Sequence, residues 1–253
     1  TNRALHHRLN IVQFNVGGLS THKLEEIKQW GLHIQADIID GSWHALHSGT
    51  PDDRADGILV LFRSSTIQES QIGSVALLPG RLVHIRLHYR HRACDILCCY
   101  NFMDDRSTAR LQQRQQFWNA LDASLSKIPN RNSLLIAGDM NCSVSHDPPH
   151  VGTSYFTWQG KHHLGPQHRD MTTFSQIIHK HQLTVLNGWN AQNGPTYHNG
   201  LSASRIDHFL MRATEADGAA KDVKYLTNAD IIPLNGAVHI PLYCTIKKIH
   251  FSY

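Results

Sequence analysis

Short apolar runs, rich in β-branched residues and separated by polar or Gly/Pro segments, recur along the whole chain. Such runs are typical of β-strands bounded by turns. They are Leu9 to Val16, Asp56 to Phe62, Leu82 to Tyr89, Cys94 to Phe102, Ser133 to Asn141, Leu183 to Asn187, Arg205 to Met211 and His239 to Ile246. In LVHIRLHY apolar and polar residues alternate, which predicts a strand with one solvent-exposed face. DILCCYNF and SLLIAG are almost continuously apolar and predict strands covered on both faces. HYRHR, between two runs, predicts a hairpin.

Helical periodicity is confined to fewer segments. The clearest helix is predicted between Ser107 and Pro129, where a period of about 3.6 residues joins Leu111, Trp118, Leu121, Leu125 and Ile128. Thr172 is the predicted cap of a second helix, whose inner face carries Phe174, Ile177, Ile178 and His181. Leu24, Ile27 and Trp30 indicate a third. Many strands with a few connecting helices predict packed sheets flanked by helices.

The chain has 253 residues, of which 41% are hydrophobic, and this length is compatible with one large core. No repeat, low-complexity tract or linker divides it, so we predict a single domain over 1–253. No apolar run approaches the length of about 18 residues that a membrane-spanning helix needs, and the N-terminus has no apolar signal core. We therefore expect a soluble protein. Whether a segment before Thr1 was removed stays open.

Charge and cysteine content narrow the partners and the compartment. The net charge is +4, with 24 Lys and Arg against 20 acids. This fits an anionic partner or an ordinary surface, but not a dedicated basic DNA-binding domain. Five cysteines without a CxxC pair argue against a disulfide framework. We expect reduced, mostly buried thiols and a reducing or intracellular compartment.

Twenty histidines are scattered along the chain. The densest group is His162, His163 and His168 with Asp170, which lacks a recognised metal-binding spacing such as HExxH. We predict no metal site there.

The sequence LLIAGDMNC carries the strongest local chemical signal. An apolar strand that ends in Gly138-Asp139-Met140-Asn141 places a carboxylate and an amide at one strand end, where they could hold and deprotonate a water molecule. A strand end turned by Asp and Asn is the ordinary alternative. Other polar elements accompany it: FNVGGL with Asn15, CCYNF with Tyr100 and Asn101, GPTYHNGLSASRIDHFL with Thr196 and Asp207, and GAVHIPL with His239.

In this order, the elements resemble the endonuclease domain of non-LTR (LINE-type) retrotransposons, within the endonuclease/exonuclease/phosphatase superfamily that includes apurinic endonucleases. The resemblance covers nearly the whole chain. It implies a four-layered α/β sandwich with two packed, mostly antiparallel sheets flanked by helices. It also implies a Mg²⁺-dependent site that cleaves DNA phosphodiesters.

The resemblance assigns a role to each matching residue. Asp139 would be the general base, Asn141 would help to position the water and the phosphate, and Asp207 would orient His239 toward the phosphoryl oxygens. Tyr100, Asn101 and Thr196 would contact the phosphate or its leaving group. Asn15 would sit beside the metal ion.

Two departures remove carboxylates from this pattern. The family carries a metal-binding Glu shortly after its second strand, but here ADIID runs directly into GSWHALHSG, and no Glu lies between Glu26 and Glu69. Asp37 and Asp40 lie on the expected strand and are no obvious replacement. Near the C-terminus, the family's Ser-Asp-His reads Ala237-Val238-His239. Losing two negative charges should sharply weaken Mg²⁺ binding, whose ligands are mainly oxygen anions.

Three functions therefore compete. A catalytically degenerate domain, retained as a binding or structural subunit of a larger assembly and holding no metal, ranks slightly above an active Mg²⁺-dependent DNA endonuclease. A phosphatase or phosphodiesterase acting on small substrates ranks well below both. The partners would be protein subunits in the first case and DNA in the second. A continuous chain at Asp40-Gly41 is assumed throughout.

Overall fold

The computed structural model describes residues 6–15, 21–33, 43–49, 57–88, 93–145, 147, 149–154, 168–190, 194–199, 202–218, 220–227 and 237–250. The helices are α1 (Thr21–His33), α2 (Thr108–Lys127) and α4 (Met171–Lys180), with short 3-10 turns at Glu69–Gln71 and Leu186–Gly188. The strands are β1 (His6–Gln13), β2 (Trp43–Ser48), β3 (Ile58–Arg63), β4 (Ile72–Leu78), β5 (Leu82–His88), β6 (Ala93–Tyr100), β7 (Ser133–Asp139), β8 (Leu183–Val185), β9 (Tyr197–Asn199), β10 (Ser202–Ser204), β11 (Asp207–Arg212), β12 (Lys224–Tyr225), β13 (Ala237–His239) and β14 (Leu242–His250).

The largest sheet has six strands in the order β4-β5-β6-β7-β11-β8. Its strands pair antiparallel except for the parallel pair β6 and β7. Successive side chains of a strand point to opposite faces, so the apolar strands β6, β7 and β11 need cover on both sides. Both predicted continuous runs, DILCCYNF and SLLIAG, do lie in such buried strands.

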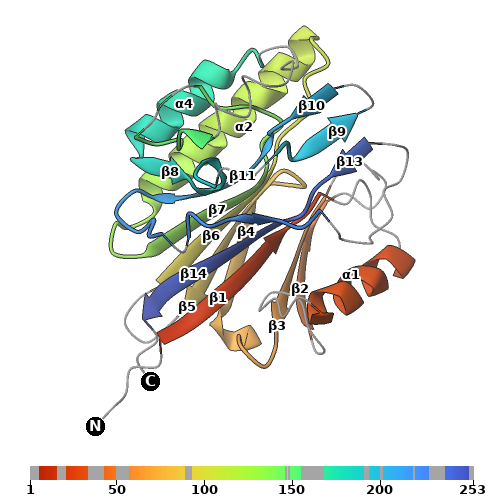
Figure 1. The fold of residues 1–253 in the computed structure, drawn as a ribbon, viewed down its shortest axis with the longest axis vertical. Helices are drawn as coiled ribbons and strands as arrows, with labels where there is room; N and C mark the ends of the chain where they lie inside the picture. The colour runs from red at the N-terminus through yellow and green to blue at the C-terminus, as the bar shows by residue number, and fades with distance from the viewer. Residues whose placement is uncertain are drawn as a thin grey trace.

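Helices α2 and α4 cover one face of this sheet (Figure 1). Leu97, Leu134, Ile136 and Leu210 point to this side and form a core with the apolar residues of the two helices. Trp118 of α2 stacks on Phe174 of α4, with ring centroids 4.9 Å apart. This layer therefore joins both helices to the centre of the sheet.

The opposite face packs against β1 and β14 and against the hairpin of β2 and β3 (Figure 1). The contributing residues include Leu9 and Ile11 of β1, Phe62 of β3, and Leu242, Cys244 and Ile246 of β14. Helix α1 lies beside β2 and β3 (Figure 1), and its Trp30 contacts Phe14 just after β1 with ring centroids 6.3 Å apart. The expected sandwich of facing, mostly antiparallel sheets flanked by helices is confirmed.

The strand predictions are correct in kind but wrong at the C-terminus. The run His239 to Ile246 is two strands in different sheets, because β13 ends at His239 and β14 begins at Leu242. Pro241 lies between them and has no N–H to donate to a ladder, while the N–H of Ile240 bonds to the Thr196 carbonyl at 2.7 Å. The sequence analysis also missed β2, β4, β9, β10 and β12.

Two helix details differ from the prediction. Leu111, expected on the inner face of α2, is 38% exposed, and Arg114 is buried there instead. Helix α4 starts at Met171, so Thr172 lies within it and is not its cap. The reason in both cases is an ion pair between Arg114 and Asp170, which holds the start of α4 against α2.

Three further expectations are a hairpin at HYRHR, reduced and buried cysteines, and no membrane-spanning helix. His88 and Ala93 pair across β5 and β6, as the hairpin requires, although the HYRHR tip lies outside the described residues. All five cysteines are free, and burial raises the pKa of Cys94 and of Cys244 to about 12. Among the helices that the structure describes, none is long and apolar enough to cross a bilayer.

Gly138, just before the strand end, allows β6 and β7 to approach. Its φ is +146°, and a Cβ built there would lie 1.9 Å from the Cys99 carbonyl oxygen. We expect Gly138→Ala to lower the free energy of unfolding by about 3 kcal/mol or more, because backbone must move to admit the methyl group. Denaturant unfolding measures the change. Gly218→Ala is the matched control, since nothing lies within 4 Å of its added Cβ; equal stability of the two variants would contradict the prediction.

Candidate active site

The GDMN sequence forms a tight turn at the end of β7. Oδ1 of Asp139 accepts a hydrogen bond from the Asn141 N–H at 2.8 Å. Asn141 has a φ of 45°, in the left-handed region that Asn tolerates better than most residues. The Asn141 side chain then donates to the Asn101 carbonyl at 2.8 Å and faces Oδ2 of Asp139 at 3.3 Å. Carboxylate and amide therefore lie together, as the sequence predicted.

A buried ion pair between α2 and the residue before α4 holds this turn in place. Arg114, 1% exposed, donates to Asp170 through Nε at 2.9 Å and through Nη2 at 2.7 Å. The same guanidinium donates to the carbonyl oxygens of Phe102 and Asn141, the latter at 3.1 Å. Trp118 Nε1 also donates to Asp170. Burial alone would raise the pKa of Asp170, but the bonds from Arg114 and Trp118 hold it below its usual value.

Asn15 connects the turn to the opposite sheet. It follows β1, and its Nδ2 donates to Oδ2 of Asp139 at 2.8 Å. The same atom lies 3.3 Å from Nε2 of His239. The amide nitrogen of Asn15 therefore faces both the carboxylate of Asp139 and the imidazole of His239.

His239, at the end of β13, lies between the two buried aspartates. Its Nδ1 is 3.0 Å from Oδ2 of Asp207, so this nitrogen carries a proton and donates it. Its Nε2 lies 3.9 Å from Oδ2 of Asp139. The expected contact between Asp207 and His239 is therefore present.

Further bonds hold Asp207 at the start of β11, next to Asp139 in the sheet register. Gln13 of β1 donates to its Oδ1 at 3.0 Å. The hydroxyl of Thr196 accepts from the N–H groups of Ile206 and Asp207 at 3.0 and 3.1 Å. Asn187 donates to the Asp207 carbonyl at 3.1 Å. These bonds fix the direction from which Asp207 meets the imidazole.

Burial and charge shift the proton equilibria of the cluster. Burial, followed by the neighbouring charge of Asp207, raises the pKa of Asp139 to about 7, while His239 and the bonds from Asn141 and Asn15 oppose the shift. Burial disfavours the charged imidazole, but the carboxylates of Asp207 and Asp139 raise the pKa of His239 above its ordinary value. A carboxylate with a pKa near neutrality is suited to take a proton from water.

The residues expected to contact phosphate lie around the cluster. Tyr100 pairs with Asp139 across β6 and β7, and the Arg81 guanidinium covers its ring at 4.7 Å. Asn101 is fully buried, donates to the Met140 carbonyl at 3.1 Å and accepts from the Phe102 N–H. Thr196 is also fully buried beneath Asp207. For Asn101 and Thr196 the geometry shows support of the site, and their phosphate contacts stay predictions.

Three residues of the site were missed by the sequence analysis. Gln13 lies two positions before Asn15, and alternate residues of a strand share a face, which could have pointed to it. Asn187 sits in the turn after β8, with no local signal. Tyr197 pairs with His239 across β9 and β13, with ring centroids 4.7 Å apart, and only the sheet register brings them together.

Among the residues that the structure describes, Asp139, Asp207 and His239 form a group that could bind a metal ion, with ligand atoms within 4.8 Å of one another. The set fits Mg²⁺ poorly, because Mg²⁺ prefers an octahedron of oxygen ligands and one of the three groups is an imidazole. Each carboxylate oxygen also already accepts a hydrogen bond. The segment with Asp37, Asp40 and Gly41 lies outside the described residues.

The histidine group set aside in the sequence analysis is partly described. Nδ1 of His168 accepts from the Ser143 N–H at 3.2 Å, and Asp170 pairs with Arg114. His162 and His163 lie outside the described residues. The two described members therefore serve the packing of α4.

Comparison with known proteins identifies similar folds. The sequence model of the Endonuclease/Exonuclease/phosphatase family matches residues 12–223. A Neisseria 3′ phosphatase, NExo, solved with a product DNA hairpin, has a TM-score of 0.68 at 17% identity, over 97% of this chain and 100% of that one. The endonuclease domain of TRAS1, a telomere-specific non-LTR retrotransposon, has a TM-score of 0.63 at 12% identity, over 95% and 98%. The AP endonuclease LMAP from Leishmania major has a TM-score of 0.68 at 11% identity, over 95% and 88%.

One curated relative is similar in sequence. An uncharacterized 149 kDa protein of transposon TX1 from Xenopus laevis is 29% identical over 88 residues, which are 35% of this chain. The match spans 6% of that relative's length.

Folding stability should depend on pH through this cluster. The pKa of Asp139 rises from 3.8 to about 7 on folding, so the folded state binds more protons than the unfolded state between these values. The free energy of unfolding therefore falls as pH rises through this window, and the raised pKa of His239 acts in the same direction. Between about pH 5 and about pH 8, we expect Asp139→Asn to reduce this fall by on the order of 2 kcal/mol. Chemical denaturation at each pH measures it, with exposed Asp222→Asn as control; parallel curves for wild type and Asp139→Asn would contradict it.

Proposed function

Because the chain belongs to the Endonuclease/Exonuclease/phosphatase family, we propose that it is a catalytically degenerate descendant of a non-LTR retrotransposon endonuclease. In this proposal it serves as a binding or structural subunit of a larger assembly. The likeness to the TRAS1 domain and the match to a transposon TX1 protein support the origin. The hydrogen bonding of the carboxylates around His239, and the Val238 that precedes it, support the loss of activity.

The observation that carries the proposal is that the carboxylate oxygens of the site already accept hydrogen bonds from neighbouring residues. Oδ1 and Oδ2 of Asp139 accept from Asn141 and Asn15, and those of Asp207 accept from Gln13 and His239. Val238 stands where the family's pattern has an acid, so no third carboxylate adjoins His239 in β13. A divalent cation would have to displace amide donors without an additional negative charge to compensate.

Catalysis of phosphoryl transfer depends mainly on positioning and electrostatic stabilisation. Asp139 could still take a proton from water, and His239, oriented by Asp207, could still donate a hydrogen bond to a phosphoryl oxygen. Under this proposal the site holds no metal ion to stabilise the negative charge that develops on the phosphoryl oxygens. Loss of a metal ion from such a site costs several kcal/mol at the transition state, which corresponds to orders of magnitude in rate.

An active, metal-dependent DNA endonuclease is the second candidate. The specific observation in its favour is that Asn15, Asp139, Asn141, Asp207 and His239 are all assembled, with the pKa of Asp139 at about 7. An additional ligand from residues outside the described ranges would be needed to complete a metal site. Nicking activity distinguishes the two candidates directly.

We expect the purified protein not to nick supercoiled plasmid with Mg²⁺ or Mn²⁺ above the level of Asp139→Ala. Val238→Asp should not restore nicking, since one new carboxylate cannot replace the Glu that the family carries after its second strand. Conversion of supercoiled to open-circular DNA on a gel measures the activity.

The control for these assays is Asp222→Ala, which removes an exposed carboxylate outside the cluster. Metal-dependent nicking by the wild type and Asp222→Ala, but not by Asp139→Ala, would overturn the proposal in favour of the endonuclease. Activity that appears with Val238→Asp alone would show that only one carboxylate was missing.

Binding to the assembly should not depend on the inherited catalytic residues. Once a protein that copurifies with the native chain is identified, we expect wild type and Asp139→Ala to bind it with the same affinity, because a buried residue cannot touch a partner directly. Titration by calorimetry measures this, and circular dichroism checks that the variant is folded. Weakened binding by a folded Asp139→Ala protein would show that the site itself is used.

A further inference from the structure

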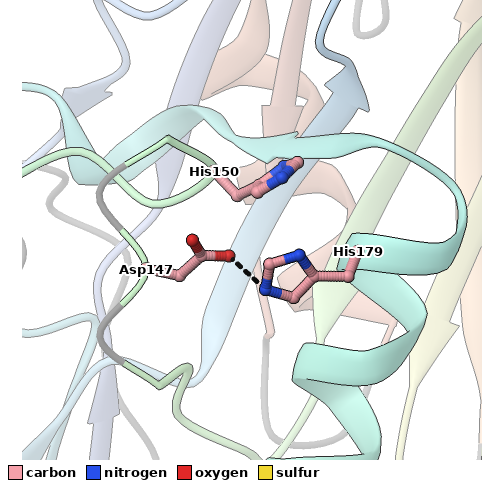
Figure 2. Close-up of side chains that lie close together, drawn as sticks. All are labelled: Asp147, His150 and His179. Atoms are coloured by element: carbon pink, nitrogen blue, oxygen red, sulfur yellow. Dashed lines mark ion pairs between the residues drawn. The ribbon is translucent and has the colours of Figure 1, made fainter.

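A second cluster of metal-ligating side chains lies between the loop after β7 and helix α4. It consists of Asp147 and His150 from the loop and His179 from α4, and one ligand atom from each lies within 4.8 Å of the others (Figure 2). We propose that these residues bind a divalent transition-metal ion of the Zn²⁺ class. This inference is independent of the proposed function.

His150 is held as a metal-binding histidine usually is. Its Nδ1 lies 2.6 Å from the Leu183 carbonyl oxygen, which can only accept, so Nδ1 carries the proton and Nε2 keeps its lone pair. Metal-ligating histidines commonly donate their other ring N–H to a backbone carbonyl in this way. The His150 backbone is fixed as well, since its N–H bonds to the Asp147 carbonyl at 3.0 Å and its carbonyl accepts from Val185 at 2.8 Å.

Asp147 supplies the negative charge of the cluster. Its Oδ2 is buried and has no aligned hydrogen bond among the described residues, although it lies 2.8 Å from Nε2 of His179 (Figure 2). A buried carboxylate oxygen without a hydrogen bond is costly unless a cation compensates it. With metal bonds of about 2.0–2.2 Å, tetrahedral ligand atoms lie about 3.3 Å apart, so Asp147 Oδ2 and His179 Nε2 would separate by about half an ångström when the ion binds.

The donor set selects the kind of metal. Two imidazoles and one carboxylate suit Zn²⁺ and its neighbours, whereas Mg²⁺ prefers oxygen ligands alone. Three protein ligands leave a fourth position open to water or to another group. The His179 side chain is 56% exposed, which provides an entry path from solvent.

This cluster is separate from the Asp139 cluster. Leu183, which holds His150, pairs with Arg212 at the far end of β11 from Asp207. At about 3.3 Å per residue, the two ends of β11 lie about 17 Å apart. A metal ion here would cross-link the loop that follows GDMN to helix α4, and it would stabilise the fold without entering the other site.

The test is binding of Zn²⁺ to metal-free protein in competition with a chromophoric chelator. We expect the wild type to bind one Zn²⁺ equivalent that His179→Ala does not bind, or binds with much lower affinity. Removal of an outer-shell partner lowers metal affinity by about 10- to 100-fold, and removal of a direct ligand should lower it by at least as much. His179 is exposed on its helix, so this variant should fold. Asp147→Asn should weaken binding in the same way, and Mg²⁺ should not compete.

Two controls separate this cluster from other sites. His47→Ala removes an exposed histidine of β2 and should bind Zn²⁺ like the wild type, which accounts for adventitious histidine binding. Asp139→Asn should also retain the equivalent. Zn²⁺ should raise the melting temperature of wild type, His47→Ala and Asp139→Asn, but not of His179→Ala. Equal Zn²⁺ binding by wild type and His179→Ala would overturn the proposal, as would loss of the ion in Asp139→Asn alone.

Discussion

The buried ion pair between Arg114 and Asp170 is the interaction on which the candidate active site depends most. One guanidinium joins α2 to the start of α4 and also binds the carbonyl oxygens of Phe102 and Asn141, which follow β6 and β7. Removing one partner of such a pair leaves an uncompensated buried charge and typically costs about 3–5 kcal/mol. The turn that presents Asp139 is therefore held by the helical layer behind the sheet.

The other side of the same turn is held by residues from two smaller sheets, which contain β1 and β13. Asn15, just after β1, donates to Asp139, and Gln13, the last residue of β1, donates to Asp207. His239, the last residue of β13, lies next to both carboxylates. These bonds stabilise the two buried acids, and the raised pKa of Asp139, about 7, reflects the remaining electrostatic cost of burial and of the neighbouring Asp207. Under the proposed function, an arrangement that satisfies its own carboxylates could persist without metal-dependent catalysis. That is the physical basis for considering a binding role for a nuclease-type fold.

The two histidine clusters differ in the chemistry that they can support. In the first, His239 uses one nitrogen for Asp207 and its other nitrogen faces the side-chain amide of Asn15, so it is suited to hydrogen bonding and proton transfer. In the second, Nδ1 of His150 faces a carbonyl oxygen, so Nε2 keeps its lone pair, and the neighbouring Oδ2 of Asp147 has no hydrogen bond within the described part of the chain. Both depend on β11, whose two ends approach the two clusters, and this strand keeps them apart.

The sequence by itself determined the core strands, the helix between Ser107 and Pro129, the GDMN turn and the set of polar strand ends, because these follow from local periodicity and from the turn chemistry of Asp and Asn. The tertiary structure alone decided the break at Pro241, the burial of Arg114 in place of Leu111, and the convergence of Gln13, Asn187 and Tyr197 on the site. It also decided the cluster of Asp147, His150 and His179, which no spacing in the sequence indicated. Such contacts join residues that are far apart in the chain, and their energies depend on which sheets and helices pack together, which local propensity does not specify.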